Sequence, residues 1–389
     1  MDNFVYDIGT KIYFGKGQIE NLGAAVKAWG DKALLVYGGG SIKKTGVYDK
    51  AMESLKKAGV STVELAGVEP NPRVTSVREG VKLCRENGVQ VVVPIGGGSS
   101  IDCAKVIAGS VSYEGDPWDL VIGKAKYKSF LPIVSVLTLS ATGSEMDAVA
   151  VISNMDTNDK LGTGHPDMRP KASILDPTYT FTVSKYQTAS GTADIMSHIM
   201  ENYFGGSEGA YLQDRMAEGL LKTCIKYGVV AVREPENYEA RANLMWASSH
   251  AINGLISLGK DHPWSVHSME HQLSAYYDIT HGVGLAILTP AWMDAILSDK
   301  TVDKFVDFAV NVWGVTPKAD KFETAKEGIA ALRAYFKELG IPQTLPEVGI
   351  KDETHFDVMA EKAEQGGLLK AYVPLPAAKI KEIYRACMG

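Results

Sequence analysis

The first half of the chain alternates short apolar runs with amphipathic segments. Four apolar runs have the length and the β-branched content of buried strands, at residues 33–37, 61–65, 90–95 and 131–137. Segments with helical spacing lie between them, at residues 48–58, 74–87 and 99–108. Residues 5–14 read as a small hairpin. Strands separated by helices predict a doubly wound, parallel, Rossmann-like α/β sheet.

From about residue 184 the pattern changes to long segments with a 3.6-residue period, and strand signals almost vanish. These segments cover residues 189–204, 211–232, 238–257, 283–297, 301–312 and 322–339. We therefore expect two domains: an α/β domain at residues 1–183, whose glycine-rich turns suggest dinucleotide binding, and an all-helical domain at residues 184–389, whose clustered histidines suggest metal binding.

Composition narrows the class of protein. The 389 residues carry a net charge of −6, so the protein has no basic field to attract nucleic acid. No apolar stretch reaches the roughly 20 residues that span a bilayer, and the N-terminus has no leader pattern. The four cysteines are far apart, which is typical of reduced thiols. We expect a cytoplasmic protein that binds neither nucleic acid nor membrane.

A glycine turn follows the strand at residues 90–95. Gly96, Gly97, Gly98 and Ser99 stand between this strand and a helix start, where backbone N–H groups can bind a pyrophosphate. The turn departs from G-x-G-x-x-G, so by itself it also fits a strand-to-helix turn without a ligand.

A second glycine cluster, which includes Gly38, Gly39 and Ser41, follows the first strand. No acidic residue stands at this strand end to bind a ribose 2′-hydroxyl. The glycines leave room for a 2′-phosphate, which Ser41, Lys43 or Lys44 could bind. This favours NADP(H) over NAD(H), although the lysines could also point into solvent.

A third polar stretch follows the strand at residues 131–137. It contains Thr138, Ser140 and Thr142 and ends at Glu145. Hydroxyls at the end of a buried strand suit a ribose, a phosphate or a carboxamide, and equally the capping of the next segment.

Histidines with helical spacing mark a candidate metal site. Asp194 and His198 are four residues apart and share a helix face, and His267 and His271 repeat this spacing. His281 precedes Gly-Val-Gly. Spacing alone allows His267, His271 or both as ligands. One carboxylate with three imidazoles suits Zn²⁺ or Fe²⁺. His262, before Pro263, reads as a loop residue near the site.

Together these residues resemble the iron-containing (group III) alcohol dehydrogenase family. The segment from Tyr37 to Gly46 resembles its butanol dehydrogenase branch, which includes NADPH-dependent aldehyde reductases. The matching pieces are Gly96–Ser99 with Asp102 and Lys105, Thr142–Glu145, Lys160, Leu175–Pro177, Asp194-x-x-x-His198, His267-x-x-x-His271 and His281-Gly-x-Gly. The resemblance implies a dehydroquinate synthase-like architecture and a homodimer.

The resemblance also assigns the site residues. It implies one divalent metal bound by Asp194, His198, His267 and His281, and it leaves His271 as a catalytic residue near the nicotinamide. Asp102 is a candidate for both catalysis and cofactor binding. The candidate cofactor residues are Gly38, Gly39, Ser41, Asn71, Gly96, Gly97, Gly98, Ser99, Asp102, Thr138, Ser140, Thr142, Asp147 and Lys160. Many relatives have asparagine at the position of Asp147, and a carboxylate is poorly placed beside phosphates.

We expect reversible reduction of an aldehyde to a primary alcohol, with the metal as a Lewis acid and NAD(P)H as the hydride donor. Four alternatives stay open: a polyol dehydrogenase, a dehydroquinate synthase-like lyase, a metal-dependent hydrolase, and a non-catalytic protein that binds metal or nucleotide.

Overall fold

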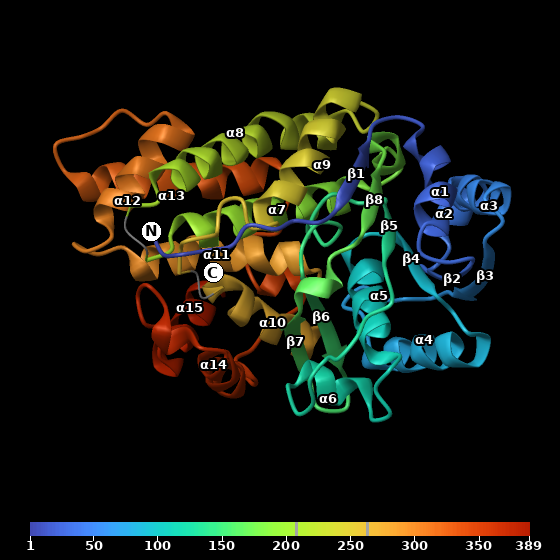
Figure 1. The fold of residues 1–389 in the computed structure, drawn as a ribbon. Coiled ribbons are helices and arrows are strands. Elements are labelled where there is room, and N and C mark those ends of the chain that lie inside the picture. Colours follow the sequence, from blue (N-terminus) through green and yellow to red (C-terminus); the bar gives the residue numbers. More distant parts are fainter. Residues whose placement is uncertain (207–208, 262–263) are drawn as a thin grey trace. The chain divides into compact units, whose positions relative to one another are not determined.

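The computed structural model describes residues 1–206, 209–261 and 264–389, and the chain divides into two compact units (Figure 1). The sheet unit contains Asp7–Val183 and Pro235–Asn253. The helical unit contains Met1–Tyr6, Ser184–Glu234 and Gly254–Gly389. His262, for which we expect a loop near the site, lies outside the described residues.

A six-stranded parallel sheet forms the centre of the sheet unit, as the alternating pattern predicts. Its order is β1-β8-β5-β4-β2-β3. The strands are β1 Lys11–Phe14, β2 Lys32–Val36, β3 Ser61–Leu65, β4 Val91–Gly96, β5 Val134–Leu137 and β8 Ala172–Leu175. The strand order reverses between β2 and β4, so their carboxyl ends form the switch point at which parallel sheets bind ligands. Both glycine turns of the sequence lie at this point.

Helices cover both faces of the sheet because successive strand residues point to opposite sides. Leu34 and Val36 face a core formed with α4 Val74–Asn87, α5 Gly98–Ser110 and α6 Pro117–Val121. Ala33 and Leu35 face the core formed with α1 Leu22–Lys27, α2 Ser41–Lys44 and α3 Val47–Lys57. The helix α9 Tyr238–Ile252 adds Met245 to a smaller cluster with Leu137 and Leu175.

One local prediction for the sheet unit was wrong, and one hairpin was not predicted. The expected hairpin at residues 5–14 is the single strand β1, which pairs in parallel with β8. An antiparallel hairpin is present elsewhere, formed by β6 Val149–Asn154 and β7 Asp159–Gly164. Its connection, from Met155 to Asn158, contains Asn158 in the left-handed region at φ 49°. Asparagine tolerates this conformation, and such a polar turn after an apolar run is a hairpin signal.

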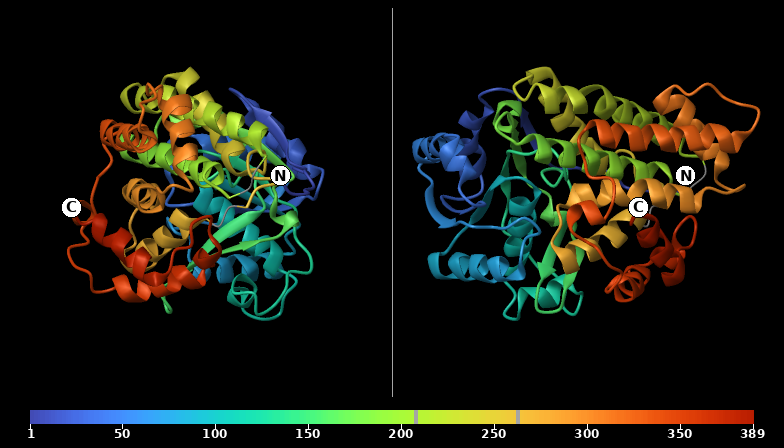
Figure 2. Two further views of the ribbon diagram at one scale, coloured as in Figure 1. Left: turned by 90° about the vertical axis from the view of Figure 1, so that its left-hand side faces the viewer. Right: turned by 180° about the vertical axis from the view of Figure 1, so that it is seen from behind.

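The helical unit is built around α7 Lys185–Tyr203, which is buried on almost every side. Two helices, α8 Tyr211–Arg233 and α11 His281–Ile296, pack along it, and all views show the three side by side (Figures 1 and 2). The other helices are α10 Ser265–Tyr277, α12 Val302–Asp307, α13 Lys321–Glu338, α14 Phe356–Gln365 and α15 Ala377–Ala386. Every strand of the described chain lies in the sheet unit.

The segment expected at residues 301–312 is α12 followed by a π-helical turn, Phe308–Val312. Our pattern analysis did not predict α10, α14 or α15 as separate helices. Short 3₁₀ turns complete the chain at Gln18–Asn21, Pro166–Met168, Pro177–Thr180, Pro346–Val348 and Leu368–Lys370.

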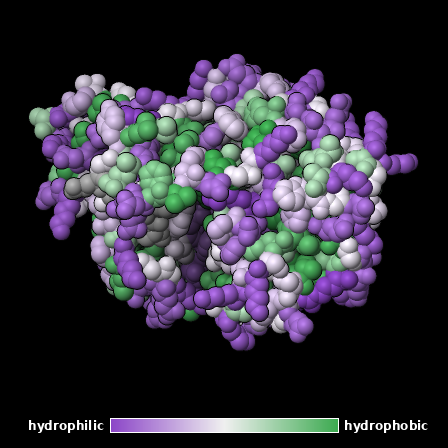
Figure 3. Space-filling view, viewed as in Figure 1, coloured by the Kyte–Doolittle hydropathy of each residue, from purple (hydrophilic) through white to green (hydrophobic). Residues whose placement is uncertain are grey.

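The surface and the helices were expected from the sequence to be of mixed polarity, without long apolar segments. In the face shown in Figure 3, hydrophobic residues form scattered patches among hydrophilic ones. Within the described ranges, no helix has both the length and the apolarity that a bilayer crossing requires.

Candidate functional site

The helix α7 presents Asp194 and His198 on one face, one turn apart. Ser184 caps this helix by accepting a hydrogen bond from the backbone N–H of Gln187. Both site side chains are buried, and Nδ1 of His198 lies 3.6 Å from Oδ1 of Asp194. The i, i+4 spacing seen in the sequence thus brings an imidazole and a carboxylate together.

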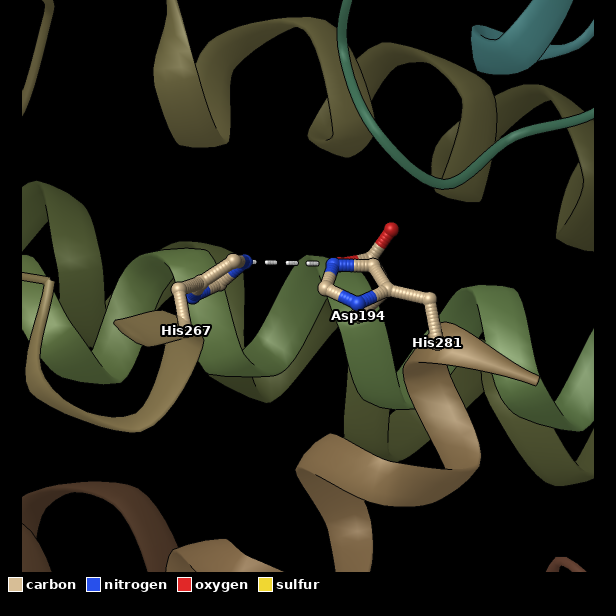
Figure 4. Close-up of side chains that lie close together, drawn as sticks. All are labelled: Asp194, His267 and His281. Carbon is tan, nitrogen blue, oxygen red and sulfur yellow. Dashed lines mark ion pairs between the residues drawn. The ribbon is translucent and has the colours of Figure 1, made fainter. Parts of the chain in front are cut away.

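Two more imidazoles reach the same carboxylate oxygen from the starts of neighbouring helices. Nε2 of His267, in the first turn of α10, lies 3.8 Å from Oδ1 of Asp194. Nε2 of His281, the first residue of α11, lies 3.7 Å from it. Figure 4 shows both rings pointing toward Asp194. Tetrahedral bonds of about 2.1 Å place ligand atoms about 3.4 Å apart, close to these separations.

His198 completes the metal cluster, by which we mean Asp194, His198, His267 and His281. Donor atoms of Asp194, His267 and His281 lie within 4.8 Å of one another. His198 is not part of that group of three, but its ring stacks on His267 with centroids 4.6 Å apart. Two carboxyls of the helical unit also contact the cluster: Glu201 contacts Nδ1 of His267, and Glu270 contacts Nδ1 of His281.

The cluster contains buried polar atoms that lack the partner which burial normally requires. In the part of the chain that the structure describes, Oδ1 of Asp194, Nδ1 of His198 and Nε2 of His267 have no hydrogen-bond partner. Buried polar groups almost always have a hydrogen-bond partner, so three buried polar atoms without one, close to a single point, indicate a binding site for a ligand. Their chemistry, one carboxylate oxygen and imidazole nitrogens, fits a divalent metal such as Zn²⁺ or Fe²⁺.

Electrostatics keeps Asp194 ionised and His198 neutral, which are the forms that bind a metal. Burial opposes ionisation of Asp194, but the surrounding histidines outweigh it and hold its pKa well below the usual range. Burial lowers the pKa of His198 to about 3, so its ring is neutral at physiological pH. For His267, burial lowers the pKa, but the charge of Glu201 outweighs it and raises the pKa to about 9. A proton on His267 must therefore leave when a metal binds.

The Gly-Val-Gly motif after His281 has a packing role. A Cβ on Gly282 would lie 2.1 Å from the backbone oxygen of Ser190 in α7, so only glycine permits this approach of α11. A Cβ on Gly284 would lie 2.9 Å from Cγ of Glu270. The two glycines thus place His281 beside α7 and leave space for the carboxyl that contacts it.

The structure also places the other histidines. His271 lies one turn after His267 on α10, and its ring centroid is 5.8 Å from that of His281. His271, Glu270 and His281 form a second group with donor atoms within 4.8 Å of one another. His250 is half-buried on α9, where its ring meets Trp246 edge-on.

In the sheet unit, the glycine turn after β4 leads directly into α5. Among the described residues, no side chain caps the N-terminus of this helix. A Cβ on Gly98 would lie 2.4 Å from the side chain of Thr142, and one on Gly97 would lie 3.2 Å from that of Leu139. An uncapped helix end behind glycines packed on the next loop fits a bound pyrophosphate.

Acidic candidates near this turn are held by internal contacts. Asp102 accepts hydrogen bonds from the Ser144 hydroxyl at 2.5 Å and from the backbone N–H of Val151 at 2.8 Å. Burial raises the pKa of Asp102 to about 6. Asp147 pairs with the fully buried Lys105, whose Nζ lies 2.5 Å away. Its carboxylate is therefore balanced inside the protein.

The remaining cofactor candidates lie on loops and on the hairpin. The backbone N–H of Thr138 donates to the carbonyl of Gly96 at 2.9 Å, which joins the start of the loop after β5 to the end of β4. Thr142 accepts a hydrogen bond from the backbone N–H of Ser144 through its hydroxyl. Asn71 has a left-handed backbone at φ 52°, and Lys160 is buried on β7. Ser140 follows Thr138 in the same loop and is half-buried.

Our sequence reasoning missed one residue beside the loop after β2, Glu64 of β3. A Cβ on Gly39 or on Gly40 would meet no described atom within 4 Å, and Ser41 begins α2. Glu64 of the adjacent strand β3 contacts the hydroxyls of Tyr37 and Tyr48, and it lies 3.4 Å from Nζ of Lys43. An acid therefore reaches this strand end from the neighbouring strand. The sequence could have revealed Glu64 only through its pairing with Leu35, and predicting that pair requires the strand order.

Comparisons with known proteins show the family to which the chain is related. Residues 9–177 match the family model "Iron-containing alcohol dehydrogenase", and residues 188–388 match "Fe-containing alcohol dehydrogenase family, C-terminal". The chain is 59% identical over 388 residues to NADH-dependent butanol dehydrogenase A of Clostridium acetobutylicum, covering 99% of each chain. It is 40% identical to the NADPH-dependent aldehyde reductase YqhD of Escherichia coli, covering 95% of this chain and 94% of that one.

A solved structure shows the same fold. The crystal structure of NADH-dependent butanol dehydrogenase A from Thermotoga maritima has a TM-score of 0.95 and 40% sequence identity, and the match covers 100% of this chain and 99% of that one. The expected fold class and the expected alcohol dehydrogenase or aldehyde reductase activity are thereby confirmed. The chain belongs to the iron-containing alcohol dehydrogenase family of oxidoreductases.

Proposed function

We propose that this protein reduces straight-chain aldehydes to primary alcohols, reversibly, at a divalent metal bound by Asp194, His198, His267 and His281. The reaction consumes aldehyde, NAD(P)H and one proton, and it yields alcohol and NAD(P)⁺. The observation that carries the proposal is the convergence of three imidazole nitrogens on one carboxylate oxygen, at 3.6–3.8 Å.

The chain's own residues have three tasks in this proposal. The metal cluster binds the ion, which supplies a Lewis acid for the carbonyl oxygen while the reduced nicotinamide supplies hydride. The glycine turns, with the loops that contain Thr138 and Thr142, bind the dinucleotide. The imidazole of His271 holds the proton that the alcohol oxygen receives. Asp102 holds the dinucleotide loop in place through Ser144 and Val151.

For the cofactor, we propose NADH as the preferred form. The preference for NADP(H) inferred from the sequence assumes a lysine whose charge is available to a 2′-phosphate. Glu64 offsets the charge of Lys43, and two relatives with 59% identity have NADH-dependent in their names. The relative with 40% identity has NADPH-dependent in its name, so both forms belong in the test.

We also propose a homodimer in the cytoplasm, and either iron or zinc as the native metal. One carboxylate with three imidazoles suits both metals. The strand β1 is an edge of the sheet, where a second copy could pair.

The test is the oxidation of NADH and of NADPH by butanal, followed at the absorbance band of the reduced nicotinamide. We expect butanal to oxidise the reduced nicotinamide, with a higher kcat/KM for NADH than for NADPH. Hydroxyacetone should oxidise little of either cofactor. Relatives with 31% and 30% identity are 1,3-propanediol dehydrogenases, so 1,3-propanediol is the comparison alcohol for the reverse direction. A lack of nicotinamide oxidation with every aldehyde, by protein that contains metal, would contradict the proposal.

A further inference from the structure

Two buried carboxyls stand behind the metal cluster and contact its imidazoles from the side away from Asp194. Glu270 is fully buried, and Glu201 is 4% exposed. Glu270 contacts Nδ1 of His281, and Glu201 contacts Nδ1 of His267. Burying a carboxylate is costly unless a partner compensates its charge, so the buried position of these two carboxyls needs an explanation.

The geometry orients each ring. In both histidines Nδ1 meets a glutamate, and Nε2 lies 3.7–3.8 Å from Oδ1 of Asp194. An Nδ1–H that donates to a carboxylate leaves the lone pair on Nε2, the atom on the Asp194 side. The glutamates therefore select the ring orientation and the tautomer that a metal requires.

The two glutamates differ in their other contacts. Glu201 also accepts backbone N–H groups of Val266 at 2.7 Å and of His267 at 3.2 Å. These groups lie in the first turn of α10, whose N-cap residue Trp264 has a left-handed φ of 51°. Glu201 thus caps α10 from α7, so removing it would disturb folding as well as metal binding.

Glu270 is the cleaner case. Its Oε1 accepts a hydrogen bond from the Ser274 hydroxyl one turn along α10 and its Oε2 contacts His281. Gly284 leaves the space that its side chain occupies. Two features of the chain, Ser274 and Gly284, therefore help to place this carboxyl against His281.

We propose that Glu270 is a positioning residue, which holds His281 for metal binding, and that Glu201 does the same for His267 while capping α10. This inference rests on the proposed metal site. Because a carboxylate partner raises the basicity of a histidine ligand, its removal weakens metal binding by about 10- to 100-fold.

The experiment measures Zn²⁺ affinity by competition with a chelator, and the visible spectrum of the Co²⁺-loaded protein, without aldehyde or nicotinamide. The variants are Glu270→Gln, Glu270→Ala and Ser274→Ala. The matched control is Glu218→Gln, because Glu218 is a buried glutamate of the same unit that contacts Tyr203, Arg215 and Asn311 instead.

We expect Glu270→Ala to weaken Zn²⁺ affinity about 10- to 100-fold and to change the Co²⁺ spectrum, because the ligand field shifts when His281 is no longer held. Glu270→Gln should retain more affinity, since its amide oxygen still accepts from Nδ1–H. Ser274→Ala should show a smaller loss, and Glu218→Gln should bind like the natural protein.

The outcomes separate the inference from the proposed function. If the natural protein binds no Zn²⁺ or Co²⁺, the proposed function fails. If it binds the metal and both Glu270 variants match its affinity and its Co²⁺ spectrum, the positioning role is wrong and the metal site stands. If Glu270→Ala does not fold, Glu270→Gln and Ser274→Ala give the same decision.

Discussion

Lys105 shows how a single buried charge accounts for an acid that the sequence left unexplained. Its side chain is fully buried, and Nζ lies 2.5 Å from Asp147 and 2.8 Å from the carbonyl of Val149. Asp147 therefore has an internal cation as its partner. The sequence could not reveal this, because the two residues are 42 positions apart.

We predict that Asp147→Asn destabilises the protein by about 3 kcal/mol, because it leaves the Lys105 charge buried without its counterion. Denaturant unfolding measures the change. Glu53→Gln is the control, since Glu53 pairs with Lys57 on the exposed face of α3. This variant should have the same stability as the natural protein within measurement error. If Asp147→Asn were as stable as the natural protein, the ion pair with Asp147 would not be what compensates the buried charge of Lys105.

The four cysteines lead to a second prediction at the residue scale, which concerns the reactivity of their thiols. All are buried, and burial raises the pKa of Cys84, Cys224 and Cys387 to about 12. Cys103, at the start of α5, also has a raised pKa because of burial. A thiol reagent at pH 8 should therefore react with none of them in the native protein and with four after denaturation. Rapid modification of a native thiol would contradict this.

The residue scale also shows the limit of motif reading. Spacing and family resemblance proposed Asp194, His198, His267 and His281, and the structure brings Asp194, His267 and His281 into one group, with His198 beside them. Glu201 and Glu270 stayed hidden. In the sequence they look like helix-surface acids, and only the packing of α10 and α11 against α7 shows which imidazoles they contact.

At the scale of elements, the close approach of α11 to α7 depends on one glycine. We predict that Gly282→Ala destabilises the helical unit by about 2–4 kcal/mol, because its Cβ would lie 2.1 Å from the Ser190 carbonyl oxygen. It should also lower metal content, since His281 begins α11. Thermal unfolding and metal analysis measure the two effects.

The control is Gly219→Ala in α8, where a Cβ would meet no described atom within 4 Å. Alanine is the better helix former, so this variant should be more stable by about 0.5–1 kcal/mol. A Gly282→Ala protein as stable as Gly219→Ala would rule out the proposed contact.

A buried carboxyl links α9 to the sheet unit's loops and creates a pH dependence. Glu145 accepts a hydrogen bond from Ser249, and burial raises its pKa from 4.5 to about 7. The native state therefore holds a proton that the unfolded chain releases. Its contribution to stability is full below pH 4.5 and is lost as pH rises to about 7, by about 3 kcal/mol.

We predict that Glu145→Gln removes this dependence, because the amide does not ionise. Urea unfolding at pH 5, 6, 7 and 8 should give a flatter stability profile for the variant than for the natural protein. The prediction fails if the two profiles have the same slope between pH 5 and pH 7.

Element type was easier to predict than element partners. The runs of Val, Ile and Leu at β2 and β4 identified buried strands, and Ser61–Leu65 and Val74–Asn87 have the bounds expected from pattern alone. The N-terminal hairpin was wrong because β1 pairs with β8, whose partner residues stand 161 positions later in the chain, as in the pair Lys11 and Ala172. Such non-local pairing leaves no trace in a short window of sequence.

At the scale of the whole molecule, the composition and the change of pattern near residue 184 were enough to predict an α/β part and a helical part. Cofactor preference was harder to read. The preference for NADH that we propose rests on Glu64, which reaches the end of β2 only because β3 lies beside β2. The strand order decides this point, and a short window of sequence does not contain it.

The central claim is one divalent metal at Asp194, His198, His267 and His281. The most direct measurement is the metal content per chain of the natural protein and of His281→Ala, together with NADH oxidation by butanal before and after chelation. The account predicts about one Zn²⁺ or Fe²⁺ per natural chain, loss of both metal and turnover in His281→Ala, and recovery of the chelated natural protein with one equivalent of metal. Full turnover in protein shown to contain no metal would contradict it.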